Sequence, residues 1–396
     1  MIRSEVSSPL PGAQDPAGAH VNGQTGAKHT ALVAGTLVTM SLVATVLKAG
    51  TWPIPGLHYQ FSIAQALTSN PDANYLYTSY LQPATFRFLS LPRTLDIYAL
   101  YCAALAVLFL IVFTVALVHV HGASWKLVGI IAFPIILVPI YWVGLDGGTL
   151  LLVLAVTLTL NSPWSWLFAV LLSWQHPEQG TLGFSVLALT LLCAGRRVVF
   201  RRVMMVVAVL LVGQAALAIY FVFVDVRVSH GRILYAWRHF AEFARMWLLS
   251  WPAILWSLCG AGWLLLLVQW RRVWPIFTAV PVVMVTLIVV TDHTRVGVIG
   301  LSPALAYWVF FNRDFWQNLK PLWLSGTLAL HLIVPVTYVW GGLNCGSVLE
   351  HTIRQFDSLT SVSSAFRWRA RAHEPCPRGR PFFLFPYRPA PWEPSR

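Results

Sequence analysis

The feature that most constrains this chain is a succession of apolar runs separated by short polar, Gly-containing or Pro-containing connections. Eleven runs predict helical spans, at about residues 31–47, 97–118, 127–144, 148–160, 164–174, 181–194, 203–224, 248–268, 275–290, 296–311 and 322–339. A helix that crosses the hydrocarbon of a bilayer needs roughly 20 apolar residues. With 57% hydrophobic and 10% charged residues, and a mean hydropathy of +0.66, the chain is one that water solvates poorly. The sequence therefore predicts an all-α, polytopic transmembrane helix bundle with about 11 spans.

Two of these runs are short. Residues 148–160 and 164–174 are either short or tilted spans, or a re-entrant pair around Asn161-Ser162-Pro163. Both alternatives add an even number of crossings, so the orientation of the later spans is the same in either case.

The composition also divides the chain into three parts. Residues 1–30 are rich in Ser, Gly, Pro and Ala and are predicted to be a disordered cytoplasmic leader. Residues 31–342 form the transmembrane helical domain, in which the connection 51–94 is long enough to have its own structure. Residues 343–396 are a basic tail, dense in Pro and Arg, that we expect to be disordered.

The positive charges indicate an orientation. Short connections on the cytoplasmic side of a membrane are enriched in Lys and Arg. Such residues occur here in alternate connections, namely Lys28, Lys126, Arg196, Arg197, Arg201, Arg202, Arg271, Arg272, Arg313 and Lys320. We expect these, and the N-terminus, to be cytoplasmic in the inner membrane. Eleven spans would then place the basic tail outside, which conflicts with the charge rule, although long terminal segments follow that rule poorly.

The net charge of +13 favours contact with anionic lipid and does not require nucleic acid as a partner. The remaining connections face outward and carry every acid between residues 50 and 300. No acid lies within a predicted span.

Three polar motifs begin helices that run inward from the outer face. They are Asp146-Gly147-Gly148-Thr149, Gln175-His176-Pro177-Glu178-Gln179-Gly180 and Asp292-His293-Thr294-Arg295. Each motif has a structural explanation, because Asp is a good N-cap residue and Pro suits the first helical turn. Capping does not explain the accompanying His and Arg residues, nor the two consecutive glycines.

The functional interpretation is a phosphate site formed where three helix N-termini meet. Free N–H groups and positive dipole ends favour anions there, and an arginine can bind phosphate through two hydrogen bonds. The expected phosphate-binding residues are Arg295, Asp146, Gly147, Gly148 and Thr149. The candidate general bases are Glu178, Asp292, His176 and His293. No metal or other cofactor is expected.

The order of the three motifs resembles that of a little-characterised group of bacterial multi-pass membrane proteins found alongside polysaccharide genes. The overall plan is similar to the glycosyltransferases of the GT-C class and to O-antigen polymerases, which use polyprenyl-phosphate-linked sugars at the outer face. The chain differs from the GT-C pattern because its first outer connection has only Asp72 in place of a paired acidic motif. It also lacks the large, late outer loop of typical polymerases.

The resemblance implies a membrane glycosyltransferase or polysaccharide polymerase that acts on a polyprenyl-linked sugar. Two alternatives stay open from the residues alone. One is a transporter or lipid flippase, for which charged groups at a gate and discontinuous helices are natural. The other is a noncatalytic subunit of an envelope assembly, in which the motifs are helix caps.

Overall fold

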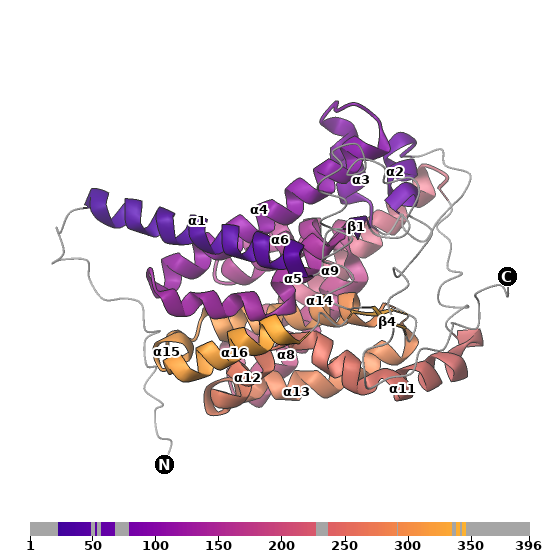
Figure 1. Cartoon of the computed structure of the whole chain (residues 1–396). Coiled ribbons are helices and arrows are strands. Elements are labelled where there is room, and N and C mark those ends of the chain that lie inside the picture. Colours follow the sequence, from indigo (N-terminus) through magenta and orange to yellow (C-terminus); the bar gives the residue numbers. More distant parts are fainter. Residues whose placement is uncertain are drawn as a thin grey trace, which may run out of the picture.

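A computed structural model describes residues 23–48, 52–53, 57–67, 79–226, 237–290, 292–334, 338–340 and 343–345. The described chain is predominantly α-helical (Figure 1). In its first half lie α1 (Gly23–Lys48), α2 (Leu57–Gln65), α3 (Leu81–Phe88), α4 (Leu95–His121), α5 (Pro134–Tyr141), α6 (Asp146–Leu158), α7 (Trp164–Gln175) and α8 (Pro177–Cys193). In its second half lie α9 (Arg197–Phe223), α11 (Phe240–Cys259), α12 (Gly262–Val268), α13 (Trp270–Thr286), α14 (His293–Leu305), α15 (Arg313–Gln317) and α16 (Pro321–Ile333).

Membrane-spanning character is strongest in three helical segments. Leu95–His121, Arg197–Phe223 and Trp270–Val289 are long and apolar enough to cross a membrane, and α11 with α12 makes a fourth if the bent pair is one span. The prediction of a helical protein with membrane-spanning segments is thus confirmed in its coarse form. The expected number of about 11 spans is not confirmed, because several of the other apolar helices are too short.

Proline and glycine explain where the expected spans are interrupted. The run 127–144 consists of a 3₁₀ helix (Trp125–Ala132), α5 and a short strand, β2 (Trp142–Val143). Pro134 begins α5 because proline has no N–H to donate to the preceding turn. The run 248–268 is bent by 77° between α11 and α12, where Gly260 adopts φ 54°, a conformation that favours glycine.

The C-terminal spans are also shorter than expected. After α14 the chain continues as a π-helix (Ala306–Phe310), in place of one uninterrupted α-helix over 296–311. The last run, 322–339, is helical only as far as Ile333 and is followed by the antiparallel strands β3 (Tyr338–Trp340) and β4 (Leu343–Cys345).

The predicted terminal segments are mostly beyond what the structure describes. Residues 1–22 and 346–396 lie outside the described residues, and so do Asp72 and the connection 227–236. Helix α1 begins at Gly23, within the stretch predicted as a leader. The connection 51–94 contains α2, α3 and β1 (Trp52–Pro53), which pairs in parallel with β2.

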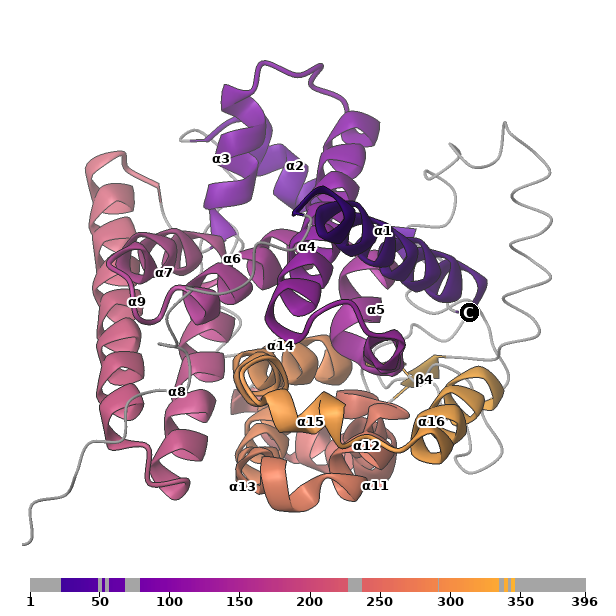
Figure 2. The same cartoon turned by 90° about the vertical axis from the view of Figure 1, so that its left-hand side faces the viewer.

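The helix α14 lies in the interior and organises the site. Every residue from His293 to Leu305 is buried except Arg295. Figure 2 shows α14 between the α4–α7 group above it and the α11–α13 group below it. Helices α2 and α3 pack on each other and project from the bundle at the top of both views (Figures 1 and 2).

Candidate functional site

Arg295 is the centre of a buried ionic cluster formed by two helices. Its Nε atom lies 2.9 Å from Oδ2 of Asp292 and 3.7 Å from Oδ2 of Asp146, the first residue of α6. The side chain of Asp146 is 0% exposed, that of Asp292 is 11% exposed and that of Arg295 is 13% exposed. Two acids and one base give the cluster a formal charge of −1 when all three are ionised. A buried charge is costly unless it is paired, so the pairing with Arg295 stabilises both carboxylates.

Neither carboxylate caps its own helix. Asp292 occupies the N-cap position of α14, but its side chain makes no capping hydrogen bond. Asp146 follows Leu145, the N-cap residue of α6, and its oxygens accept no hydrogen bond from the described residues. Helix capping, the structural alternative for these two acids, is therefore not the interaction they make. They pair with Arg295 instead.

The three motifs meet at one end of three helices. Trp308 Nε1 donates to Thr190 Oγ1 across 3.1 Å, and Gly183 lies against Pro303. The first contact in α8, at Gly183, meets the earlier residue Pro303, and the later one, at Thr190, meets the later residue Trp308. The two helices therefore run parallel, with their N-termini at the same end. Gln175, the last residue of α7 and two residues before α8 begins, donates from Nε2 to the Leu145 carbonyl across 3.1 Å, which brings this junction to the start of α6.

The cluster lies far from the ends of the long helices. A Cβ atom on Gly147 would be 2.6 Å from the backbone nitrogen of Ala106, near the middle of the 27-residue helix α4. Ala106 is about 17 Å from the first residue of α4, at 1.5 Å per residue. Trp174 Nε1 donates to the carbonyl of Gly213 in α9, about 15 Å from the last residue of that helix. Measured along α4 and along α9, this end of the site thus lies at a similar distance from the helix ends.

The depth of Asp146 in the bundle was not anticipated from the sequence. Asp146 was expected in an outer connection, with no acid inside a span. It lies instead beside the middle of α4, because α5, α6 and α7 are too short to reach both ends of the bundle. The connection between residues 141 and 146 is consequently internal, and Leu145 and Asp146 are both buried.

Protein atoms surround the glycines expected to bind phosphate. Besides the contact of Gly147 with Ala106, a Cβ on Gly148 would lie 2.7 Å from Oε1 of Gln82 and 3.0 Å from Nε2 of Gln175. Both glycines therefore have a packing role. The hydroxyl of Thr149 is buried and donates to the Leu145 carbonyl across 2.9 Å. Phosphate binding by these three residues stays a prediction.

The other candidate bases differ in burial. His293 is fully buried at the start of α14, and His176 is buried between α7 and α8, where it is the N-cap residue of α8. Glu178, in the first turn of α8, is exposed. Gln179 follows it and is buried, and its Oε1 atom has no hydrogen-bond donor among the described residues.

A pair of buried glutamines was not anticipated as part of this region. Gln175 Nε2 also donates to Gln82 Oε1 across 2.8 Å, and Gln82 Nε2 donates to the Gly144 carbonyl across 3.1 Å. These bonds tie α3, which belongs to the connection 51–94, to the start of α6. Gln175 was part of a recognised motif, whereas Gln82 belongs to no motif and lies in the long connection 51–94.

Comparison of the chain with protein-family models, with curated proteins and with solved structures gave no significant match. Fold and site together define a helical protein with segments long and apolar enough to span a membrane, in which an Asp–Arg–Asp cluster lies deep among the N-termini of three helices. Any function must be argued from that cluster.

Proposed function

We propose that the protein is an integral membrane glycosyltransferase or polysaccharide polymerase acting on a polyprenyl-phosphate-linked saccharide. It would work from the outer face of the cytoplasmic membrane, with its N-terminus cytoplasmic and the shorter helices completing the remaining crossings. The observation that carries the proposal is the cluster of Asp146, Arg295 and Asp292, which unites motifs distant in the sequence. Charged groups deep in a helix bundle are costly, and they generally mark a functional site.

Each charged residue has a role in this proposal. Asp292 is the more accessible of the two carboxylates, so it takes the proton from the acceptor hydroxyl. The acceptor oxygen then bonds to the anomeric carbon as the bond from that carbon to the phosphate oxygen breaks. Glu178, His176 and His293 are the other candidates for this base.

Arg295 stabilises the charge on the departing phosphate. Since two carboxylates already neutralise Arg295, the phosphate must replace one of them. Asp292 is the carboxylate to be displaced, because Asp146 is fully buried and holds the guanidinium in position. The positive ends of α6, α8 and α14 add to the attraction for the phosphate.

Buried acceptors support a saccharide as the ligand. Both carboxylate oxygens of Asp146 and Oε1 of Gln179 lack a hydrogen-bond donor among the described residues. A buried acceptor left without a donor costs about 1–3 kcal/mol. Sugar hydroxyl groups are donors that would satisfy these atoms.

A transporter or lipid flippase is the second candidate, and the depth of the cluster favours it. Substrate sites of transporters lie near the bilayer midplane, where short helices end. The contact of Gly147 with the middle of α4 fits that description. The same cluster would then gate or bind a substrate without chemical change.

The decisive experiment uses purified protein in detergent, because transport needs two compartments and transferase chemistry does not. Polyprenyl-linked saccharide with a radiolabelled sugar is incubated with the wild-type protein, Arg295→Ala and Asp292→Asn. Arg93→Ala and Asp96→Asn are matched controls, since both residues are exposed at the start of α4. We expect product from the wild type and both controls, and none from the two site variants.

Near-normal product from Arg295→Ala would refute the assignment of the site. If no protein forms product, the second arm uses a strain from which the gene is deleted. Lipid-linked saccharide that accumulates on the cytoplasmic face of its membrane would favour the flippase. A loss of surface glycan without activity in either assay would favour the noncatalytic subunit.

A further inference from the structure

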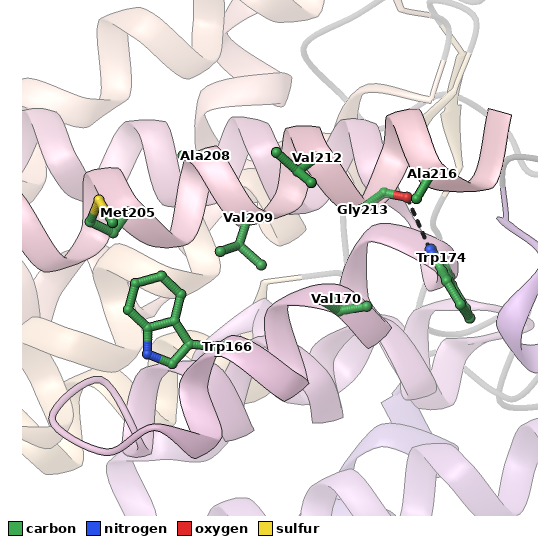
Figure 3. A pocket seen from close by; sticks show the side chains of 9 residues that line it. All are labelled: Trp166, Val170, Trp174, Met205, Ala208, Val209, Val212, Gly213 and Ala216. Atoms are coloured by element: carbon green, nitrogen blue, oxygen red, sulfur yellow. Dashed lines mark hydrogen bonds between the residues drawn. The ribbon is translucent and has the colours of Figure 1, made fainter. Parts of the chain in front are cut away.

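A second feature, separate from the ionic cluster, is an apolar groove between α7 and α9 with a volume of about 410 Å³ (Figure 3). Trp166, Val170 and Trp174 line it from α7, and Met205, Val209 and Gly213 are among the lining residues from α9. Its lining side chains face outward, since Trp166 is 41%, Met205 52% and Val212 69% exposed. The volume is within the range of ligand-binding pockets.

The groove has one closed end. The indole of Trp174 crosses between the helices and donates to the Gly213 carbonyl, as the dashed line in Figure 3 shows. From Met205 to Ala216 the lining of α9 extends about 16 Å, at 1.5 Å per residue. Half of the roughly 30 Å hydrocarbon core is about 15 Å. The groove therefore matches the depth of one leaflet.

The opposite end of the groove is positively charged. Arg201 and Arg202 precede Met205 by four and three residues, so they lie about one turn beyond it on the same side of α9. Both are exposed, and Nη1 of Arg202 donates to Oδ1 of Asn161, in the turn before α7. Arg196 is engaged elsewhere, because its guanidinium lies 4.9 Å from the Trp308 ring centroid and donates to the Tyr307 hydroxyl.

These arginines lack an acidic partner within the part of the chain that the structure describes. The sequence contains no Asp or Glu between Glu178 and Asp225. Within the described chain, neither Arg201 nor Arg202 forms an ion pair. Because α9 is long and apolar enough to span a membrane, arginines in its first turns lie at the level of the lipid head groups.

We propose that this groove binds one anionic glycerophospholipid, with an acyl chain between α7 and α9 and the phosphate at Arg201 and Arg202. Apolar walls of one leaflet's depth fit the acyl chain, and the uncompensated arginines fit the head group. The proposal does not depend on the glycosyltransferase assignment, since the groove and the ionic cluster share no residue.

The test is native mass spectrometry of the full-length protein released from detergent with phosphatidylglycerol or phosphatidylcholine of identical acyl chains. Charge is probed by Arg201→Ala combined with Arg202→Ala, and Arg271→Ala combined with Arg272→Ala is the control in the first turn of α13. Space is probed by Val212→Trp, which fills the groove. Leu211→Trp is its control, since Leu211 is 51% exposed and does not line the groove.

We expect wild-type protein to retain one phosphatidylglycerol in preference to phosphatidylcholine. The Arg201/Arg202 variant should bind phosphatidylglycerol about 25-fold more weakly, from roughly fivefold for each arginine. Val212→Trp should lose both lipids, and the two controls should behave as wild type. Equal retention of the two lipids by wild type, or unchanged retention in the test variants, would overturn the proposal. Preferential retention of polyprenyl phosphate in a direct competition would also overturn it.

Discussion

The Nε atom of Arg295 lies 3.7 Å from Oδ2 of Asp146, so a buried ion pair joins the first turns of α14 and α6. Asp292 completes the cluster from the N-cap position of α14. This arrangement predicts the order in which variants lose stability, because Arg295 contacts both acids.

Replacement of Arg295 by Met should destabilise the protein by about 3–5 kcal/mol, since it leaves buried Asp146 without a counter-charge. Asp146→Asn should cost less, because Arg295 keeps its 2.9 Å contact with Asp292. In the double variant the neutral Asn needs no cation, so much of the cost of Arg295→Met should be recovered. The free energies of unfolding in detergent of the two single variants and the double variant test this prediction. Strictly additive effects would show that the pair is not coupled.

Gly147→Ala should destabilise the protein by about 1–3 kcal/mol, because the added Cβ would lie 2.6 Å from the backbone of Ala106. Gly35→Ala is the matched control within helix α1, where a Cβ meets nothing within 4 Å. That control should be neutral or stabilising by roughly 0.5–1 kcal/mol. Thermal unfolding of the two variants tests the close packing of α6 on α4. Equal changes in stability for the two variants would contradict this packing.

Gln175→Leu should loosen the attachment of α3, since Gln82 Oε1 loses its donor, whereas the Leu145 carbonyl still accepts from Thr149. A buried acceptor left without a donor costs about 1–3 kcal/mol. Limited proteolysis should then cleave the connection 51–94 faster than in wild type. Gln65→Leu is the control, because the Gln65 side chain is exposed. Identical cleavage rates for both variants would show that the Gln82–Gln175 pair does not hold α3 in place.

The proposed orientation predicts opposite labelling of two exposed arginine positions. In a chain whose five native cysteines are replaced by serine, Arg93→Cys should react with an impermeant maleimide in intact cells. Arg271→Cys should react only in inverted vesicles, since basic connections are retained in the cytoplasm. Labelling of both positions from the same side would overturn the topology.

The sequence predicted where helices begin better than how far they continue. Capping residues and apolar composition are local properties, so α4 begins after its N-cap Thr94 close to the expected residue. Spans that contain Pro134 or Gly260 were predicted as continuous, and the structure interrupts them there. Apolar content gives no measure of helix continuity, since a buried connection is as apolar as a helix.

By itself the sequence determined that the protein is helical with segments apolar enough to span a membrane, and that Asp146, Glu178 and Arg295 stand in the first turns of helices. These facts follow from composition and from local backbone preferences. Only the tertiary structure decided that Arg295 pairs with both acids, that Gln82 joins the region, and that the cluster lies beside the middle of α4. The physical reason is that depth and charge pairing depend on how short helices pack against long ones, which no local pattern specifies.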